Sequence, residues 1–325
     1  MEKIVIQVPT IRFDDSGFNK ILAIIEKVTS FPKNNFDFDF SGCGRLDHHA
    51  VVALGGLARY IDYQNTLAER TVSNIFKSNP FSTAGAMFLV TSMSSLISNQ
   101  LIENNFLKYF SRDSFQGYPS GDYIGYREHK SILDADKIAL HLNEDWLSDE
   151  KIKLSALLKS AVVSRIFEIF MNAYGHGTSI QSIEKLGVYS CGQYDKKEKK
   201  LNLSVLDFGP GIVSNVRKNQ PHIINNVDAM HWALARGNST RTDSQHVNMP
   251  RGLGFDLLSA FVKLNEGEMR IYSNNICAKL TKDDGFIVEK SKFDFTGTLV
   301  SIRINCDDSY YHFLSEKKKD QKQYF

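Results

Sequence analysis

Short apolar runs alternate with stretches of helical periodicity over the first part of the chain. The runs IVIQV (4–8) and FDFDFSG (36–42) are typical of short strands, whereas FNKILAIIEKV (18–28) and AVVALGGLARYI (50–61) repeat apolar residues at the spacing of one helix face. Strands that alternate with helices are typical of α/β folds. The pattern therefore predicts an α/β unit that extends to about residue 110.

The next stretch, SRDSFQGYPSGDYIGYREHK (111–130), concentrates Gly, Ser, Asp and Tyr and lacks periodic apolar positions. Such a composition favours a connection between domains. We therefore expect an N-terminal domain with its connecting segment over 1–130 and a second domain over 131–310. The remaining residues, 311–325, contain clustered lysines and predict a charged, solvated tail.

The second domain combines long helical stretches with a run of strands. Residues 152–174 carry a broad apolar face and predict one long helix, and GFDLLSAFVKLN (254–265) predicts a second. The stretches 186–194 and 201–208 predict a hairpin joined by the charged turn DKKEKK, and further strands are expected at 268–273, 285–289 and 298–304. This order predicts an α+β layer, with the helices on one face of a mixed, mainly antiparallel sheet.

Composition favours a globular protein of two domains and disfavours a membrane-spanning, nucleic-acid-binding or disulfide-rich one. The chain has 325 residues, of which 42% are hydrophobic, so it can bury a substantial core and suits two domains. Its net charge of +2 gives no reason to expect nucleic acid or membrane binding. The four cysteines are scattered without a C-x-x-C pair, and no apolar run approaches a membrane span. We therefore expect a cytoplasmic protein with reduced thiols.

Three polar residues share one side of the first long helix. Glu168, Asn172 and His176 recur every four residues in the run EIFMNAYGH, so they project in the same direction. A solvent-facing polar stripe is the ordinary explanation for such a pattern. The motifs that follow favour a functional one.

Acidic and glycine-rich motifs follow at the ends of predicted elements. Asp207 ends a predicted strand, and Gly209 and Gly211 allow a sharp turn beside it in DFGPGI. Further on, RGLGF opens the second helix with Gly252, Leu253 and Gly254, whose backbone N–H groups suit an anion. Gly297 and Thr298 begin the last long strand. Each motif alone also fits a turn, a helix cap or a strand start.

Taken together, these motifs resemble the N-box, G1 box, G2 box and terminal strand motif of the GHKL ATPase superfamily, over residues 152–304. The resemblance implies that Asp207 accepts a hydrogen bond from the adenine amino group of ATP and that Asn172 holds a Mg²⁺ ion bridging the phosphates. It implies that Glu168 positions or deprotonates the attacking nucleophile and that Thr298 supports the adenine pocket.

The polar stretch between residues 212 and 252 resembles the ATP lid of the same superfamily. Lids close over a substrate and exclude water. We expect Ser239, Thr240, Arg241 and Arg251 near the phosphates, with one of the two arginines as a charge stabiliser. A polar surface loop that carries arginines is the alternative.

The N-terminal half resembles a STAS-like domain in the run FDFDFSGCGRLDHHAVVALGGLARYI (36–61). In that family a phosphorylatable hydroxyl follows the acidic turn, whereas His48 and His49 follow Asp47 here. A metal site formed by these histidines with Cys43 is the less favoured hypothesis, and cap or surface histidines are expected. The whole chain also resembles a bacterial family of ATP-binding proteins that joins these two halves.

The leading hypothesis is a Mg-ATP-dependent regulatory switch that hydrolyses ATP slowly and uses lid closure to change its contacts with the STAS-like half or with a partner protein. A protein partner or a homodimer is expected. One alternative is a serine/threonine protein kinase of the anti-sigma-factor type, which would use the same glutamate. A second is a binding module in which ATP is not hydrolysed.

Overall fold

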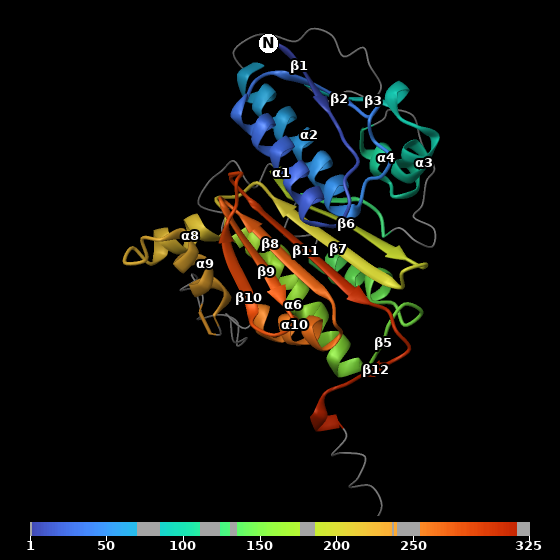
Figure 1. Ribbon diagram of the computed structural model, residues 1–325, viewed down its shortest axis with the longest axis vertical. Helices are drawn as coiled ribbons and strands as arrows, with labels where there is room; N and C mark the ends of the chain where they lie inside the picture. The colour runs from blue at the N-terminus through green and yellow to red at the C-terminus, as the bar shows by residue number, and fades with distance from the viewer. Residues whose placement is uncertain are drawn as a thin grey trace, which may run out of the picture.

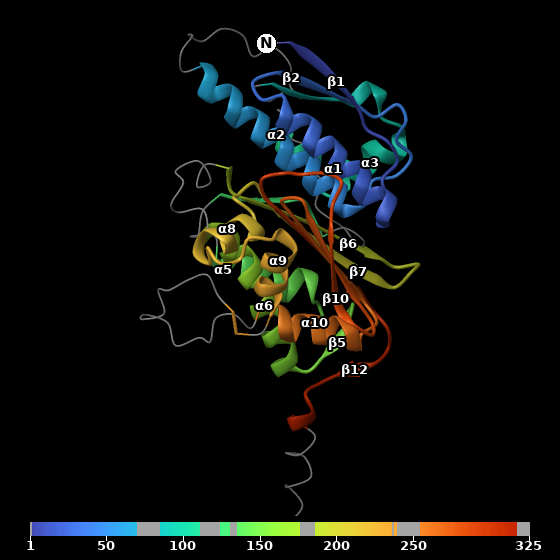
Figure 2. The same ribbon diagram turned by 60° about the vertical axis from the view of Figure 1, so that its left-hand side comes forward.

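The computed structural model of this chain describes residues 2–69, 85–110, 124–130, 135–175, 186–235, 237–238 and 254–316. These residues form a three-stranded sheet, a seven-stranded sheet and a two-stranded pair. Figures 1 and 2 show the layers in order: the small sheet, then α1 and α2, then the large sheet, then α6 and α10. Among the described helices, none is both long and apolar enough to cross a lipid bilayer.

The N-terminal half alternates strands and helices, as its hydrophobic pattern predicts. The parallel strands β1 (Lys3–Gln7), β2 (Asn35–Asp39) and β3 (Ala86–Leu89) lie in that order and are joined through α1 (Asp15–Ser30) and α2 (His48–Glu69). After β3 come η1 (Val90–Ser92), α3 (Ser95–Glu103) and α4 (Phe106–Phe110). Helix α1 begins at an N-cap, because the Asp14 side chain accepts a hydrogen bond from the Gly17 N–H at 2.7 Å.

The large sheet has the order β10-β9-β8-β11-β7-β6-β4. The strands are β4 (Arg127–His129), β6 (Val188–Asp195), β7 (Lys200–Asp207), β8 (Glu268–Ser273), β9 (Ile276–Thr281), β10 (Gly285–Lys290) and β11 (Thr298–Asn305). The pattern predicted β6, β7, β8, β10 and β11 but missed β9. It also assigned Arg127–His129 to the connection, whereas these residues pair with β6 at the sheet edge. Every described pair in this sheet is antiparallel, so the expected mixed sheet is a wrong prediction.

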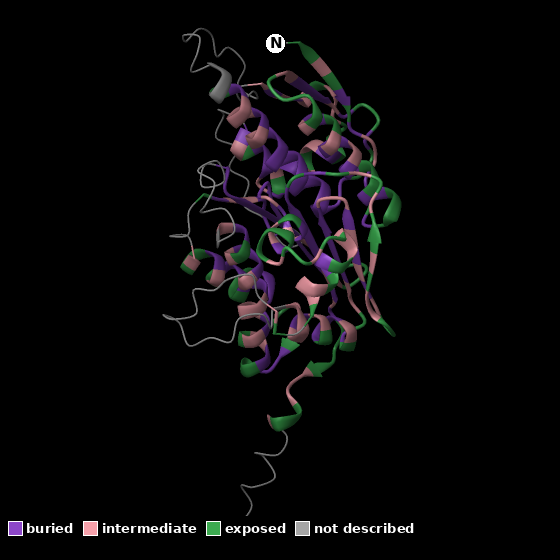
Figure 3. Ribbon diagram, turned by 90° about the vertical axis from the view of Figure 1, so that its left-hand side faces the viewer, coloured by how far each residue is buried: buried purple, intermediate pink, exposed green. Residues whose placement is uncertain are grey.

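Helices cover both faces of the large sheet, and the expectation of helices on one face only is corrected. Because side chains alternate along a strand, Leu203 and Val205 lie in the core that contains α6 (Ala156–Gly175) and α10 (Gly254–Leu264). Leu206 lies in the other core, among residues of α1 and α2. The N-terminal half therefore supplies the second cover of the sheet, and Figure 3 shows buried residues running through both layers.

Two adjacent glycines let α2 approach the large sheet closely. A Cβ atom at Gly56 would lie 2.7 Å from Leu206 Cδ2 and 3.0 Å from Phe208 Cε2, and one at Gly55 would overlap the Tyr126 ring. Contacts this short do not occur between real side chains. The GG pair in the middle of a good helix pattern is therefore explained by helix-to-sheet packing.

The remaining elements close the far end of the second domain. Helix α5 (Ala135–Leu140) and η3 (His141–Trp146) precede β5 (Lys153–Leu154), which pairs with β12 (Tyr310–Tyr311). The helix expected at 152–174 therefore begins later, after this short strand. The start of the expected tail also belongs to the fold, because the Ser155 hydroxyl donates a hydrogen bond to Glu316 at 2.8 Å.

Candidate functional site

A row of polar side chains crosses three neighbouring strands at one end of the large sheet. Asp207 is the register partner of Thr298, and Thr298 is the register partner of Ser273. By strand alternation all three share the face on which α6 and α10 pack, where their neighbours along the strands are Val205, Val300 and Ile271. The structure thus brings Asp207 and Thr298 together and adds Ser273.

Asp207 is buried, with 9% of its surface exposed. Its Oδ1 accepts a hydrogen bond from the Gly209 N–H at 2.7 Å. Burial raises the pKa of this carboxyl group to about 6, against the lowering effect of the hydrogen bonds from Gly209 and Thr298. A buried carboxylate of this kind gains stability from any further hydrogen-bond donor that reaches it.

Two glycines beside Asp207 are required by close approach. Gly211 has φ +82°, and a Cβ atom there would lie 2.8 Å from Ser273 Oγ. A Cβ atom at Gly297 would lie 2.7 Å from a ring carbon of Phe295 and would overlap the Asp207 carbonyl oxygen. Both positions therefore exclude a side chain for a steric reason.

Ser273 and Asn274 hold the loop after Asp207 in place. The Ser273 Oγ accepts from the Ile212 N–H at 2.7 Å and donates to the Gly297 carbonyl at 2.9 Å. Asn274 donates to the Pro210 carbonyl at 3.1 Å and accepts from the Ser214 N–H at 3.3 Å. The sequence pattern predicted no role for either residue. The NN pair in this turn is a local signal for hydrogen bonding to backbone, but nothing in the sequence points to a loop about 60 residues earlier.

The second half of α6 lies at the same end of the sheet. The Tyr174 hydroxyl donates to the His129 carbonyl at 2.9 Å, and His129 pairs with Val188, the register partner of Asp207. Glu168 and Asn172 lie in this half of the helix. Asn172 is exposed, so its amide is available to a ligand.

Glu168 forms an ion pair with Arg165, one turn earlier on α6. Burial raises the pKa of Glu168, and the charge and hydrogen bond of Arg165 oppose that rise. The sequence predicted that Glu168 positions or deprotonates a nucleophile, and it did not single out Arg165, although the i, i+3 spacing is that of a common helix pair.

Helix α10 begins at Gly254 near the same sheet end. The chain turns tightly through Asn265–Gly267 into β8, with the Gly267 N–H bonded to the Val262 carbonyl at 2.8 Å. The helix and strand are therefore antiparallel, and the start of α10 lies toward Ser273. Several predicted residues lie outside the described residues, namely His176, Ser239, Thr240, Arg241, Arg251, Gly252 and Leu253.

The first part of the expected lid, residues 212–251, contains two helices that the sequence did not predict. Helices α8 (Ile212–Asn219) and α9 (Asn226–Leu234) occupy it, and they bury Val213, Val216, Ala229 and Met230. The sequence did not predict these helices because their apolar residues are few and widely spaced within a polar stretch. Residues 239–253, on which the phosphate contacts were expected, are among those that the structure does not describe.

His48 and His49 are buried rather than at the surface. Their exposed fractions are 3% and 0%, and their rings stack on Phe13 and Phe18 at centroid distances of 5.1 and 4.2 Å. Among the described residues, no group of His, Cys, Asp and Glu has the arrangement of a metal site. The expectation of cap or surface histidines is therefore wrong.

A cavity of about 290 Å³ lies at the opposite end of β6 and β7, between the hairpin turn and the starts of α1 and α2. Its basic and acidic lining residues are Arg12, Arg45, Lys200, Arg303, Asp14, Asp47, Asp195 and Glu198. Several of them neutralise one another, as in the 2.6 Å Arg45–Asp47 pair. We place the candidate site at the Asp207 end, where a single buried carboxylate meets glycine-lined backbone. Searches against protein-family models and against curated proteins find no match for this chain.

Proposed function

We propose that this protein binds Mg-ATP at the Asp207 end of the large sheet, hydrolyses it slowly and acts as a nucleotide-controlled switch. The observation that carries the proposal is the buried Asp207 carboxylate, joined to Thr298 and to the Gly209 N–H, beside Gly211 and Gly297, where a side chain would not fit. The resemblance of the surrounding motifs to GHKL ATPases supports the same assignment.

The chemistry of Asp207 suits an adenine ring. The exocyclic amino group of adenine is a hydrogen-bond donor, whereas guanine has a carbonyl oxygen at that position. A buried carboxylate that faces a purine therefore selects adenine, because a carbonyl oxygen would leave the carboxylate unpaired and repelled. Thr298 already donates to Asp207 and fixes its orientation.

Asn172 and Glu168 suit the phosphate end of the nucleotide. Mg²⁺ keeps most of its water and phosphate ligands, so one exposed amide oxygen such as that of Asn172 can suffice as the protein ligand. Mg²⁺ would supply neutralisation of phosphate charge. Glu168 would hold the attacking water or accept its proton, and its half-buried position with a raised pKa favours that role.

Paired variants of α6 test the enzymatic part of the proposal. We expect Glu168→Gln and Glu168→Ala to retain Mg-ATP and to lose about a hundred- to ten-thousandfold in turnover, because a base acts on the nucleophile and not on the nucleotide. Asn172→Ala should weaken the Mg-dependent part of binding itself. Calorimetry and phosphate release measure the two effects, with Glu198→Ala in the β6–β7 turn as the control.

Wild-type turnover in Glu168→Gln would remove Glu168 from the mechanism. Binding without hydrolysis by the wild type would instead favour the binding module, which the Arg165–Glu168 ion pair also favours because it engages the carboxylate. Transfer of a radiolabel from ATP to a protein, rather than to free phosphate, would identify a kinase.

A further inference from the structure

The side chains of Asp207 and Phe208 point to opposite faces of the large sheet. Asp207 faces α6 and α10, whereas Phe208, 5% exposed, belongs to the core formed with α1 and α2. The hydrogen bond from Gly209 N–H to Asp207 Oδ1 closes a tight turn around Phe208. Any ligand that bonds to the Asp207 carboxylate therefore acts on a turn whose central side chain is packed against the N-terminal half.

The Phe208 ring is held against α2 without free space. Its centroid lies 5.2 Å from that of Tyr60, and its Cε2 atom is one of those that exclude a Cβ atom from Gly56. Close-packed interiors resist compression, so a displacement of Phe208 has to move α2 or be opposed by it.

Helix α2 in turn is tied to distant parts of the chain. Arg59 forms a 2.8 Å ion pair with Glu128 on β4, whose side chain is 1% exposed. Six residues further along α2, Asn65 donates to the carbonyl of Asn34, the residue before β2, at 3.2 Å. The helix thus links the Asp207 end of the large sheet to the edge strand β4 and to the small sheet.

We propose that occupancy of the Asp207 site is transmitted through Phe208 to α2, so that the N-terminal half responds to the adenine nucleotide. This inference rests on the proposed function and names the route by which the same site is regulated. Thermodynamic linkage makes the coupling reciprocal: whatever partner fixes α2 also changes the affinity of the site for the nucleotide.

Hydrogen exchange of the full chain with and without Mg-ATP tests the route. We expect backbone amides of α2 between residues 52 and 66 to exchange about fivefold more slowly, or slower still, with saturating Mg-ATP, which is the usual lower range of site-to-site coupling. Phe208→Leu should remove this response while ATP still binds. Phe88→Leu is the matched control, because Phe88 lies in the same core but contacts Phe38, Phe106 and Phe110.

Tyr60→Leu removes the same ring contact from the α2 side and replaces Phe208→Leu if that variant does not fold. A full α2 response in both variants, or none in the wild type while calorimetry shows bound ATP, would overturn the coupling alone. Absence of ATP binding in the wild type would overturn the proposed function and the coupling together.

Discussion

At the scale of single residues, the candidate site is defined by one buried carboxylate and the groups that donate hydrogen bonds to it. Asp207 ends β7 beside Thr298, and its remaining support comes from a backbone N–H. The described residues place no counter-charge beside Asp207, and burial raises its pKa to about 6. The cost of that burial is understandable where a ligand supplies the missing donor.

Asp207→Asn should weaken ATP binding by about ten- to a hundredfold while the fold is kept, because a mismatched buried polar contact costs roughly 1 to 3 kcal/mol. Calorimetry on the folded variant measures the loss. Asp195→Asn, at the other end of the hairpin, is the control and should bind ATP as the wild type does. Unchanged affinity in Asp207→Asn would refute the central assignment.

Binding of adenosine should strengthen as the pH rises through about 6, where Asp207 ionises. Because burial raises the pKa of folded Asp207 above its ordinary value of 3.8, the ligand-free protein loses stability as the pH rises between these values, and the adenine amino group offsets that loss. Adenosine is the suitable probe because it carries no phosphate that titrates in this range. Equal affinity at pH 5 and pH 7.5 would contradict the role of the carboxylate.

At the scale of elements, α2 is the component that joins the two halves. Its glycine pair allows contact with the large sheet, where Tyr189 of β6, Leu206 of β7 and Phe208 just after β7 crowd Gly56. Its polar side chains reach β4 and the small sheet. A helix that looks like an ordinary amphipathic segment is therefore buried on most sides.

Gly56→Ala should lower the free energy of unfolding by about 1 to 3 kcal/mol, the usual cost of inserting a methyl group into a filled core. Urea unfolding followed by circular dichroism measures this change. Gly42→Ala is the matched control, because a Cβ atom at Gly42 meets nothing within 4 Å. If both variants were equally stable, the close packing of α2 would be wrong.

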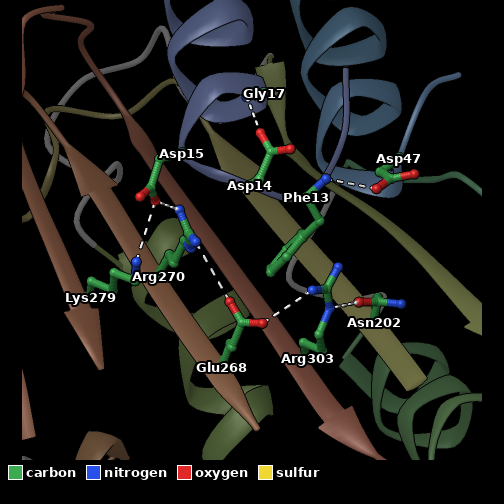
Figure 4. A network of polar contacts seen from close by, with 10 residues as sticks. All are labelled: Phe13, Asp14, Asp15, Gly17, Asp47, Asn202, Glu268, Arg270, Lys279 and Arg303. Carbon is green, nitrogen blue, oxygen red and sulfur yellow. Dashed lines mark hydrogen bonds and ion pairs between the residues drawn. The ribbon is translucent and has the colours of Figure 1, made fainter. Parts of the chain in front are cut away.

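At the scale of the whole molecule, a charged network fixes the N-terminal half on the large sheet. Figure 4 shows Glu268 between Arg270 and Arg303, at 3.6 and 3.1 Å, and Asp15 of α1 between Arg270 and Lys279. Phe13 lies under the Arg303 guanidinium at 3.9 Å from its ring centroid. The buried His48 ring stacks on Phe13, and the buried His49 ring stacks on Phe18. Both histidines experience the positive charge of nearby arginines, namely Arg45, Arg270 and Arg303.

Acid should destabilise the protein through these histidines. Burial first, and then Arg270 and Arg303, lower the pKa of His49 from 6.5 to about 3, and burial lowers the pKa of His48 as well. Because the folded pKa lies below the unfolded one, the stability is complete above pH 6.5. For His49 the stability falls as the pH drops from there toward 3, by about 1.4 kcal/mol per pH unit. Protonation of His48 destabilises the folded protein in the same direction.

Urea unfolding at several pH values between 4 and 7 checks this slope. His49→Phe should reduce the slope by the contribution of one proton, whereas His222→Phe, at an exposed position, should leave it unchanged. A slope that is the same in His49→Phe and the wild type would assign the acid sensitivity to other groups.

The sequence by itself determined the local features of this protein. Alternation and helical periodicity located most strands and the long helices, because these patterns depend on neighbours along the chain. The strand-ending Asp207 and the glycines after it were recognisable for the same reason. The sequence pattern did not predict strand β9, the Arg127–His129 edge strand, or helices α8 and α9. Their apolar residues are too few, or the segments too short, to form a recognisable periodic pattern.

Only the tertiary structure decided which surfaces meet. The placing of α1 and α2 on the second face of the large sheet follows from long-range packing that no local pattern encodes, and it buries the two histidines that the sequence placed at a helix start. Ser273 and Asn274 became part of the candidate site because strand register brings β8 beside β11 and its turn beside the Asp207 loop. Contacts between residues 60 positions apart depend on the fold as a whole, and therefore lie beyond pattern analysis of one sequence.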